Sequence, residues 1–406
     1  MSDYNDASIV MFPSGRKASK LYSQKPIDGS ADLTVTRASV ANEINSDGLI
    51  EEVAANVPRF EYGVGVTCQS LLLQPASENL LTYPLSFDNG YWTKANVSVT
   101  SGQSAPSVDN PTGAFKFIDN SSSASHGMYR LGVSGATGTY TFSIILKASQ
   151  IILAAAHFGT FSNRAEFDLS AGTYETFGGV DSASMEFLVD GWYICTVTDT
   201  FSGSDVYVQI NNLLTSGTSS YTGDGVSGIE IFAAQLEEQS YPTSLMLPVS
   251  EGSTTSRAVP VVNKTSLTNY IGQTAGVIFV DVIKDFDFGI QIGNTTGSTD
   301  FHNSIQIVIG ATQTDINIYL SNSLSFTYSG AVLTGRNKIA VAYSLNDFAL
   351  YINGSQTLTD SSGDVPVMSG IFFNHANLGT KTCGLKSLKI YKTRLINSEL
   401  ATLTTL

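Results

Sequence analysis

The stretch TYTFSIILK at residues 139–147 decides the fold class. Tyr140, Phe142, Ile144 and Leu146 alternate with other residues, and this period of two is typical of a half-buried β-strand. A helix would repeat its apolar residues at three- to four-residue spacing, and that spacing is not sustained in this sequence. The stretch therefore predicts an antiparallel strand with one face in a core.

Similar stretches surround this one between residues 78 and 248. They recur about every 10–15 residues, and Gly, Ser, Asn or Asp separates them, as in β-sandwich proteins. Two sheets that share an interior would bury such strands, so we predict a β-sandwich, or jelly roll, over 78–248. The strand candidates are Ala114–Ile118, Gly138–Lys147, Ile151–Gly159, Arg164–Asp168, Ser184–Val189, Trp192–Phe201, Val206–Asn211 and Gly228–Leu236.

A second β-sandwich is predicted over 269–406, after a polar linker at 249–268. Asn353-Gly354 lies between two strand-like pieces and is a strong hairpin signal. The segment that starts at Asn397 is the one good short-helix candidate, with Asn397 as its cap and Glu399 in its first turn. The strand candidates are Gly276–Ile283, Phe288–Gly293, Ser304–Ile309, Ile316–Leu320, Leu324–Tyr328, Arg336–Ser344, Asp347–Ile352, Gly370–Phe373 and Leu385–Tyr391.

Residues 1–77 read as a separate segment of hairpins and extended arms without a globular core of its own. Ser46-Asp47-Gly48 predicts a turn between two strand-like pieces, because Asp-Gly readily takes positive φ. An extended arm is a common way to dock on a neighbouring subunit. The predicted fold class is therefore all-β, with an N-terminal extended segment followed by two antiparallel β-sandwich domains.

Composition limits the possible partners. The 406 residues have a formal net charge of −14, and an acidic surface disfavours nucleic acid. No stretch approaches the ~18 apolar residues needed to span a bilayer, so no membrane insertion is expected. The first residues carry Asp3 and Asp6 where a secretory signal needs positive charge, so we expect synthesis in a cytoplasm.

Several phrases resemble modules of bacteriophage structural proteins. DLTVTRAS…NSDGLIEEVAANVPRFEY at 32–62, followed by SLLLQPASENLLTY at 70–83, resembles the entry segment of head-fibre and tail-fibre proteins. Three further phrases resemble a carbohydrate-binding-like jelly roll: FDNGYWTKANVSVT at 87–100, FDLSAGTYETFGGVDSASMEFLVDGWYICTVT at 167–198 and AQLEEQSYPTSLMLPVSEGSTTSRA at 234–258. The hairpin YINGSQ and the ending LKSLKIYKTRLINSELATL are similar to concanavalin-A-like or laminin-G-like sandwiches.

This resemblance implies a non-enzymatic structural protein on the virion surface, of the head-fibre or capsid-decoration type, made in the host cytoplasm. Its N-terminal segment would attach it to other virion proteins of the capsid or tail. The resemblance also implies a homotrimer whose lectin-like domains bind host-surface or environmental polysaccharide. The alternatives are a tail fibre or receptor-binding protein, a polysaccharide depolymerase, and a bacterial polysaccharide-binding protein, which the missing signal peptide disfavours.

Glycan binding needs aromatic faces beside amides and carboxylates. The candidates are Tyr91 and Trp92 in DNGYWTK, and Trp192 and Tyr193 in DGWYICTV. The alternation in WYICTVT puts Trp192 on one face and Tyr193 on the other, and one of those faces must be core. We therefore favour core positions for both tryptophans and regard the tyrosines as the better candidates for sugar contact.

Paired carboxylates would be needed for glycoside hydrolysis. Glu237 and Glu238 adjoin a strand, and Asp285 and Asp287 share a strand face. This spacing is common, so we interpret them as solvated acids and expect no catalytic residues.

Metal sites and reactive thiols have little support in the sequence. His126, His157, His302 and His375 show no zinc spacing. We expect no cofactor; a structural calcium held by Asp88, Asn89 and Asp119 is an alternative with little support. The cysteines, Cys68, Cys195 and Cys383, are far apart and are predicted to be buried free thiols.

Overall fold

The computed structural model describes residues 2–62, 69–284, 288–294, 303–310, 312–373 and 383–406. The regular secondary structure of the described chain is almost entirely antiparallel β-strand, which confirms the predicted all-β class. It divides into two compact units. Unit 1 comprises residues 1–40, 53–76 and 258–406, and unit 2 comprises residues 41–52 and 77–257. Among the described residues, no helix is long and apolar enough to cross a membrane.

Unit 2 is built on a ten-stranded sheet with the order β11-β12-β21-β14-β19-β15-β16-β17; β10 also pairs with β14, and β18 with β19. The strand bounds are β10 Thr93–Ala95, β11 Val97–Gln103, β12 Ala114–Asp119, β14 Gly127–Lys147, β15 Leu153–Phe158, β16 Arg164–Asp168, β17 Thr173–Phe177, β18 Ser182–Phe187, β19 Trp192–Leu213 and β21 Gly228–Glu237. Two short pairs, β13 (Ser123–Ser125) with β20 (Ser220–Thr222) and β9 (Ser77–Asn79) with β22 (Thr255–Arg257), complete it.

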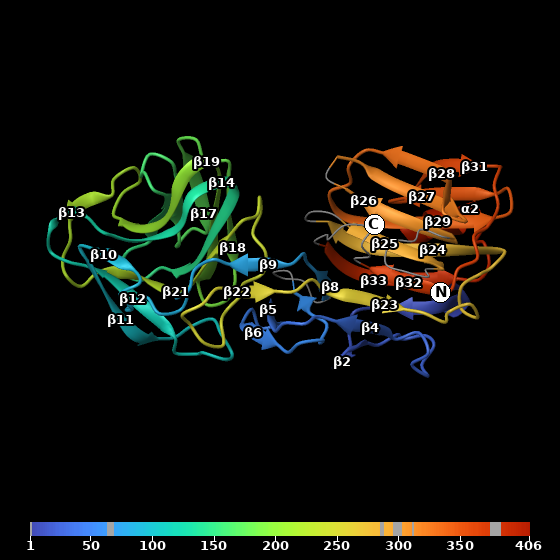
Figure 1. Cartoon of the computed structure of the whole chain (residues 1–406), viewed down its shortest axis with the longest axis horizontal. Helices are drawn as coiled ribbons and strands as arrows, with labels where there is room; N and C mark the ends of the chain where they lie inside the picture. The colour runs from blue at the N-terminus through green and yellow to red at the C-terminus, as the bar shows by residue number, and fades with distance from the viewer. Residues whose placement is uncertain (1, 63–68, 285–287, 295–302, 311, 374–382) are drawn as a thin grey trace. The chain divides into compact units, whose positions relative to one another are not determined.

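The long strands β14 and β19 let one sheet form both layers of the sandwich. They lie side by side along nearly their whole length, as Figure 1 shows. One end of the pair continues into β21 and β18, and the other end into β10 and β15. The register shifts in the middle, where Gly135 and Gly203 take positive φ that other residues rarely adopt. The sequence predicted separate shorter strands here, because glycine usually marks a strand end.

The predicted alternation in residues 139–147 is confirmed. Tyr140, Phe142, Ile144 and Leu146 all lie in the main core of unit 2. Ile145 points the other way, yet it is also buried, in a second cluster. That second face is covered partly by the hairpin β5 (Ala41–Ile44) and β6 (Ile50–Val53), whose predicted turn is present with positive φ at Gly48.

Unit 1 is a sandwich of two sheets. One sheet has the order β31-β30-β29-β24-β33-β8-β7 with β1 added on β33; the other has the order β2-β3-β4-β23-β32-β25-β26-β27-β28. A large aliphatic core contains residues of both sheets. The first sheet comprises β1 Ala7–Met11, β7 Phe60–Glu61, β8 Ser70–Leu73, β24 Ala275–Lys284, β29 Gly335–Ser344, β30 Phe348–Ile352, β31 Ser355–Asp360 and β33 Cys383–Tyr391. The second comprises β2 Arg16–Lys17, β3 Lys20–Leu21, β4 Leu33–Thr36, β23 Val261–Lys264, β25 Phe288–Asn294, β26 Asn303–Ile309, β27 Thr314–Leu320, β28 Ser323–Gly330 and β32 Gly370–Phe373.

The structure assigns residues 1–77 differently from the sequence analysis. A short helix, α1 (Ser2–Asp6), precedes β1, and β1 pairs with β33 near the other end of the chain. Ile9, Leu33 and Leu71 from this segment are all in the unit 1 core. Residues 41–52 belong instead to unit 2. The strands of this segment have distant partners, and that pairing is not visible in local sequence.

The remaining local predictions fall as follows. The predicted linker 249–268 contains β22, which pairs in unit 2, and β23, which pairs in unit 1. Asn353 and Gly354 both have positive φ and join β30 to β31, as predicted. The predicted helix is α2 (Asn397–Thr404), but Ile396 is its cap residue rather than Asn397, and the Glu399 carboxylate accepts the Ile396 N–H at 3.0 Å.

Candidate functional site

Both tryptophans proposed for sugar contact are core residues, as the sequence analysis favoured. Trp92 is 3% exposed, packs on Phe87, and donates its indole N–H to the Tyr83 carbonyl at 2.9 Å. Trp192 is 2% exposed and lies in the second cluster of unit 2. Neither indole face is open to a ligand.

The two tyrosines are half-buried. The Arg130 guanidinium lies 4.0 Å from the centre of the Tyr91 ring, so a cation already occupies one ring face. Tyr193 meets the exposed Phe187 edge-to-face with ring centres 5.4 Å apart. Tyr91 and Tyr193 share no neighbour in these contacts. Their role in glycan binding stays a prediction.

The acids singled out in the sequence behave differently from one another. Glu238 is exposed, as expected, but Glu237 is fully buried, and its interpretation as a solvated acid was wrong. Its carboxylate accepts hydrogen bonds from Ser77 Oγ, Gln235 Nε2 and both Oγ1 and N of Thr243, at 2.6–3.0 Å. These donors replace water around the buried charge. Asp285 and Asp287 lie outside the described residues.

Residues considered for metal binding have protein partners. Asp119 is buried and accepts hydrogen bonds from Asn212 Nδ2 at 2.7 Å and from the Tyr221 hydroxyl. The described part of the chain holds no group of three or more His, Cys, Asp or Glu side chains suited to a metal ion. The expectation of no cofactor stays a prediction, as does its alternative, a calcium held by Asp88, Asn89 and Asp119. His302 and His375 are outside the described residues.

Cys195 is a buried free thiol, as predicted, and burial raises its pKa well above the ordinary value. Cys68 and the side chain of Cys383 are not among the described parts of the chain.

The phrases that carry the phage resemblance contribute buried arginines. Arg37 of VTRAS and Arg257 of TSRA are each 1% exposed. The Arg37 guanidinium donates to the carbonyls of Ser39, Val53, Ala54 and Val57 at 2.8–3.1 Å. Arg257 donates to the Ser244 carbonyl at 2.8 Å. These motif residues hold loops together, so we assign them a structural role.

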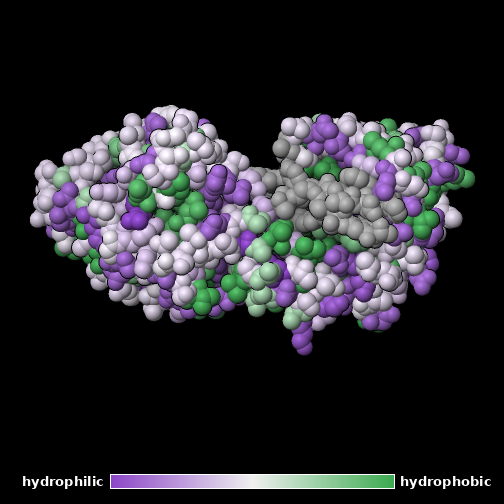
Figure 2. All heavy atoms as spheres, viewed as in Figure 1, coloured by the Kyte–Doolittle hydropathy of each residue, from purple (hydrophilic) through white to green (hydrophobic). Residues whose placement is uncertain are grey.

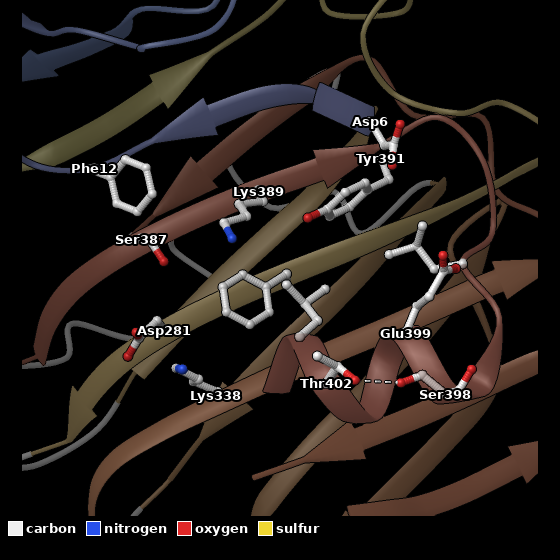
Figure 3. A pocket seen from close by; sticks show the side chains of 13 residues that line it. Asp6, Phe12, Asp281, Lys338, Ser387, Lys389, Tyr391, Ser398, Glu399 and Thr402 are labelled. Carbon is white, nitrogen blue, oxygen red and sulfur yellow. Dashed lines mark hydrogen bonds between the residues drawn. The ribbon is translucent and has the colours of Figure 1, made fainter. Parts of the chain in front are cut away.

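A hollow lies on the outer face of the first sheet of unit 1, and we call it the helix-side groove. It has a volume of about 490 Å³, within the range typical of small-ligand sites. Helix α2 lines one side, and Asp6 and Phe12, which flank β1 in the sequence, line the other; β24, β29 and β33 contribute residues between them (Figure 3). It is lined by Asp6, Phe12, Phe279, Asp281, Lys338, Ser387, Lys389, Tyr391, Leu395, Ser398, Glu399, Thr402 and Leu403.

Strand register explains the arrangement of the groove. Ser387, Asp281 and Lys338 are direct partners across β33, β24 and β29, so their side chains form one row on one face. Lys389 and Phe279 form the next row, with the Lys389 ammonium 5.2 Å from the ring centre of Phe279. The alternate residues of these strands, among them Leu388 and Val280, lie in the sandwich core.

Phe12 supplies an exposed aromatic ring at the β1 side of the groove. Its side chain is 40% exposed. The Gln24 side-chain amide holds the Phe12 backbone at both ends: Phe12 N–H donates to Gln24 Oε1 at 2.8 Å, and Gln24 Nε2 donates to the Phe12 carbonyl at 3.1 Å. An aromatic ring fixed beside charged and hydroxyl groups can pack on the apolar face of a sugar while those groups bind its hydroxyls.

The charges of the groove are mixed. Asp281 forms a two-pronged ion pair with Arg336, at 3.0 and 2.7 Å, and is 6% exposed. Lys338 is half-buried and donates to the Thr405 carbonyl at 2.6 Å. The sequence analysis missed this site. The polar Ser387 and Lys389 within the strand LKSLKIY were a usable signal, but only the register shows what lies beside them.

A second, smaller hollow of about 360 Å³ lies in unit 2, along β15, β16 and β17. Its carboxylates are largely satisfied by the protein. Glu166 is 5% exposed and binds Arg164 Nε at 2.6 Å and Ser216 Oγ at 2.6 Å. Asp168 accepts from Ser170 Oγ at 2.6 Å, and this hydrogen bond is the main cause of its lowered pKa.

His157 lies on the same outer sheet face, in the pair with Arg164. It is fully buried, its Nε2 is 2.9 Å from Asn211 Oδ1, and burial is the main cause that lowers its pKa to about 4. The Arg164 guanidinium lies between Phe161 and Phe177, at 4.3 and 4.0 Å from their ring centres. The face is packed around His157, Arg164 and Glu166, whereas Tyr174 and Glu175 are exposed at the hollow.

The fold defines a protein of two antiparallel β-sandwich units, and solved structures with similar sandwiches are known. The chain is similar to the carbohydrate-binding module of a Ruminococcus gnavus sialidase bound to α2,3-sialyllactose, at 15% identity, with 33% of this chain and 84% of that chain covered and a TM-score of 0.28. It is similar to domain 4 of a Geobacillus stearothermophilus arabinanase in complex with arabinotriose, at 15% identity, 40% and 82% coverage and a TM-score of 0.29.

Two laminin G-like domains of the mouse laminin α1 chain match at 12% identity, with 66% of this chain and 85% of that chain covered and a TM-score of 0.22. Neither a protein-family model nor a curated protein matches the sequence. These structural likenesses concern the sandwich fold, and the argument for a ligand comes from the groove itself.

Proposed function

We propose that this chain is a non-enzymatic structural protein of the bacteriophage surface, of the head-fibre or decoration type, that binds glycans in the helix-side groove. The observation that supports glycan binding is the groove: a hollow of about 490 Å³ that combines the exposed Phe12 ring with hydroxyl, ammonium and carboxylate groups. The phage assignment is supported by the sequence resemblance at 32–83, 87–100, 167–198 and 234–258. Several copies on one particle would give avidity from weak single sites.

Attachment to the particle needs a different account from the sequence-based one. Strands β1, β3, β4, β7 and β8 from residues 1–77 are paired within the sheets of unit 1. We propose that attachment to capsid or tail proteins uses the surface of the folded unit rather than a free extended arm. The homotrimer implied by the resemblance remains part of this proposal.

Glycan binding is tested with a polysaccharide array and the full-length protein. Phe12→Ala removes the exposed ring, and we expect its affinity for the bound glycan to fall about ten-fold, the effect of roughly 1.4 kcal/mol of lost contact. Leu324→Ala is the matched control, since Leu324 is 52% exposed in the same unit and does not line the groove. Equal affinities for both variants would exclude the groove as the glycan site.

The other parts of the proposal have separate tests. Negative-stain images of particles that carry a labelled copy should show label on the particle surface, and unlabelled particles would contradict a virion role. A label on the tail alone would favour the tail-fibre alternative. Incubation with host capsule should release no reducing ends, and their release would favour the depolymerase alternative.

A further inference from the structure

We infer that the helix-side groove prefers acidic glycans, those that carry uronic or other carboxylated sugars. This inference rests on the proposed glycan-binding function and adds the class of ligand. It is carried by the lysines that lie in or beside the groove and by the partners that Asp281 and Glu399 have within the protein.

The segment FPSGRKASKLYSQKPI at residues 12–27 has a charge opposite to that of the whole chain. It contains Arg16, Lys17, Lys20 and Lys25 and no Asp or Glu, whereas the protein has a net charge of −14. Arg16 and Lys17 form β2 and Lys20 begins β3, both in the second sheet of unit 1, so Lys25 is the cation of this segment that lies beside the groove. A local positive charge on an acidic protein attracts anions to that place.

This basic segment adjoins the groove through two of its residues. Phe12 lines the groove, and Lys25 forms an isolated antiparallel bridge with Val10 of β1. Val10 in turn is the partner of Lys389 on β33. Direct partners in antiparallel strands place their side chains on the same face. Lys25 and Lys389 therefore lie on the groove face, on opposite sides of Val10.

Three acids line the groove: Asp281 and Glu399 have partners within the protein, and Asp6 is exposed. Lys25 and Lys338 donate to backbone carbonyls. Asp281 is compensated by the Arg336 guanidinium, and the Glu399 carboxylate binds at the positive N-terminus of α2. Lys25 donates to the Asn5 carbonyl at 2.7 Å, and Lys338 donates to the Thr405 carbonyl at 2.6 Å. Carbonyl dipoles orient an ammonium group without cancelling its charge, so both sites suit a sugar carboxylate.

The test uses the full-length protein and a panel of uronic-acid polysaccharides, including polygalacturonate, each beside its carboxyl-reduced counterpart. The variants are Lys25→Gln and Lys338→Gln, and Lys392→Gln is the matched control, because it makes the same charge change at an exposed position of unit 1 outside the groove. We expect Lys338→Gln, in the groove, and Lys25→Gln, beside it, each to lose about three- to five-fold in affinity for a bound acidic polymer, the range of a partly exposed ion pair, and the control to lose none. Far-UV circular dichroism checks that the variants are folded.

The outcomes separate the ligand class from glycan binding itself. Binding of the acidic but not the reduced polymers, weakened by Lys25→Gln and Lys338→Gln, supports the inference. Equal binding of both polymer forms overturns the acidic preference and leaves the proposed function intact. An equal loss for Lys392→Gln overturns the assignment to the groove, because the attraction is then a property of the whole surface. Binding to no polysaccharide contradicts the proposed function.

Discussion

The groove of unit 1 and the outer sheet face of unit 2 contain the same kinds of residue and use them in opposite ways. In unit 2, Glu166, Arg164 and His157 are each less than 10% exposed and bind one another or nearby loops. In unit 1, Phe12, Lys338 and Lys389 are at least partly exposed around an open hollow. A polar sheet face is thus a site only where nothing from the same chain covers it.

The distribution of exposed hydrophobic residues does not distinguish the two units. On the face of the molecule in Figure 2, hydrophilic and neutral residues predominate, and hydrophobic side chains gather in small groups. Scattered groups of this kind are normal for a folded protein. The comparison therefore depends on which polar groups are already satisfied, and the following variants test it. Both tryptophans, Trp92 and Trp192, belong to unit 2, so tryptophan fluorescence reports that unit, whereas far-UV circular dichroism reports both.

The largest effect is expected for Glu237→Ala. It leaves the donors of Gln235, Ser77 and Thr243 without their acceptor in a buried place, so we expect the free energy of unfolding of unit 2 to fall by about 3–5 kcal/mol. Glu238→Ala, at the neighbouring exposed position, should change it by less than ~0.5 kcal/mol. Urea denaturation followed by tryptophan fluorescence measures both. Equal midpoints would mean that the buried network does not support unit 2.

Ile9→Ala tests whether the N-terminal segment belongs to unit 1. Ile9 is fully buried in the unit 1 core, so we expect a loss of about 2–4 kcal/mol in the free energy of unfolding, from the cavity and the lost burial. Ile27→Ala is the control, because Ile27 is 92% exposed. The circular dichroism transition should move while the tryptophan transition stays in place. An unchanged circular dichroism transition would indicate that residue 9 is not part of the core and would support the predicted extended N-terminal segment.

The buried His157 predicts a pH dependence confined to unit 2. Its folded-state pKa of about 4 is below the unfolded value of about 6.5, so the unfolded state binds more protons between these values. The stability is therefore complete above pH ~6.5 and decreases as the pH falls toward ~4, by at most about 1.4 kcal/mol per pH unit. Tryptophan-detected denaturation at several pH values should show this slope in the wild type and a smaller slope in His157→Gln. Identical slopes would exclude His157 as the source.

The smallest effect is expected for Gln24→Ala, which removes the amide that holds the Phe12 backbone. Gln24 is only half-buried, so the stability of unit 1 should change by less than about 1 kcal/mol. Glycan affinity should fall about two- to three-fold, because the ring is no longer held beside the groove. Isothermal titration with the best array glycan measures this change, and an effect as large as that of Phe12→Ala would indicate direct contact by Gln24.

The sequence by itself determined the local structure of this protein. Period-two alternation in residues 139–147, the Asn353-Gly354 turn and the short helix α2 are short-range features, since each depends on residues a few positions apart. Alternation in WYICTVT also indicated that one face at Trp192 is core, although it did not show that both faces of the sheet are covered at Trp192 and Cys195.

Only the tertiary structure decided where the sheets close and where a hollow stays open. The pairing of β1 with β33 joins Ala7 to Tyr391, and the row Lys25, Val10 and Lys389 exists only because of that pairing. Glu237 and Glu238 are neighbours in the chain, yet one is buried and the other exposed, because donors from Ser77 and Thr243 reach only one of them. Register and covering elements join residues far apart in sequence, and no local pattern encodes such contacts.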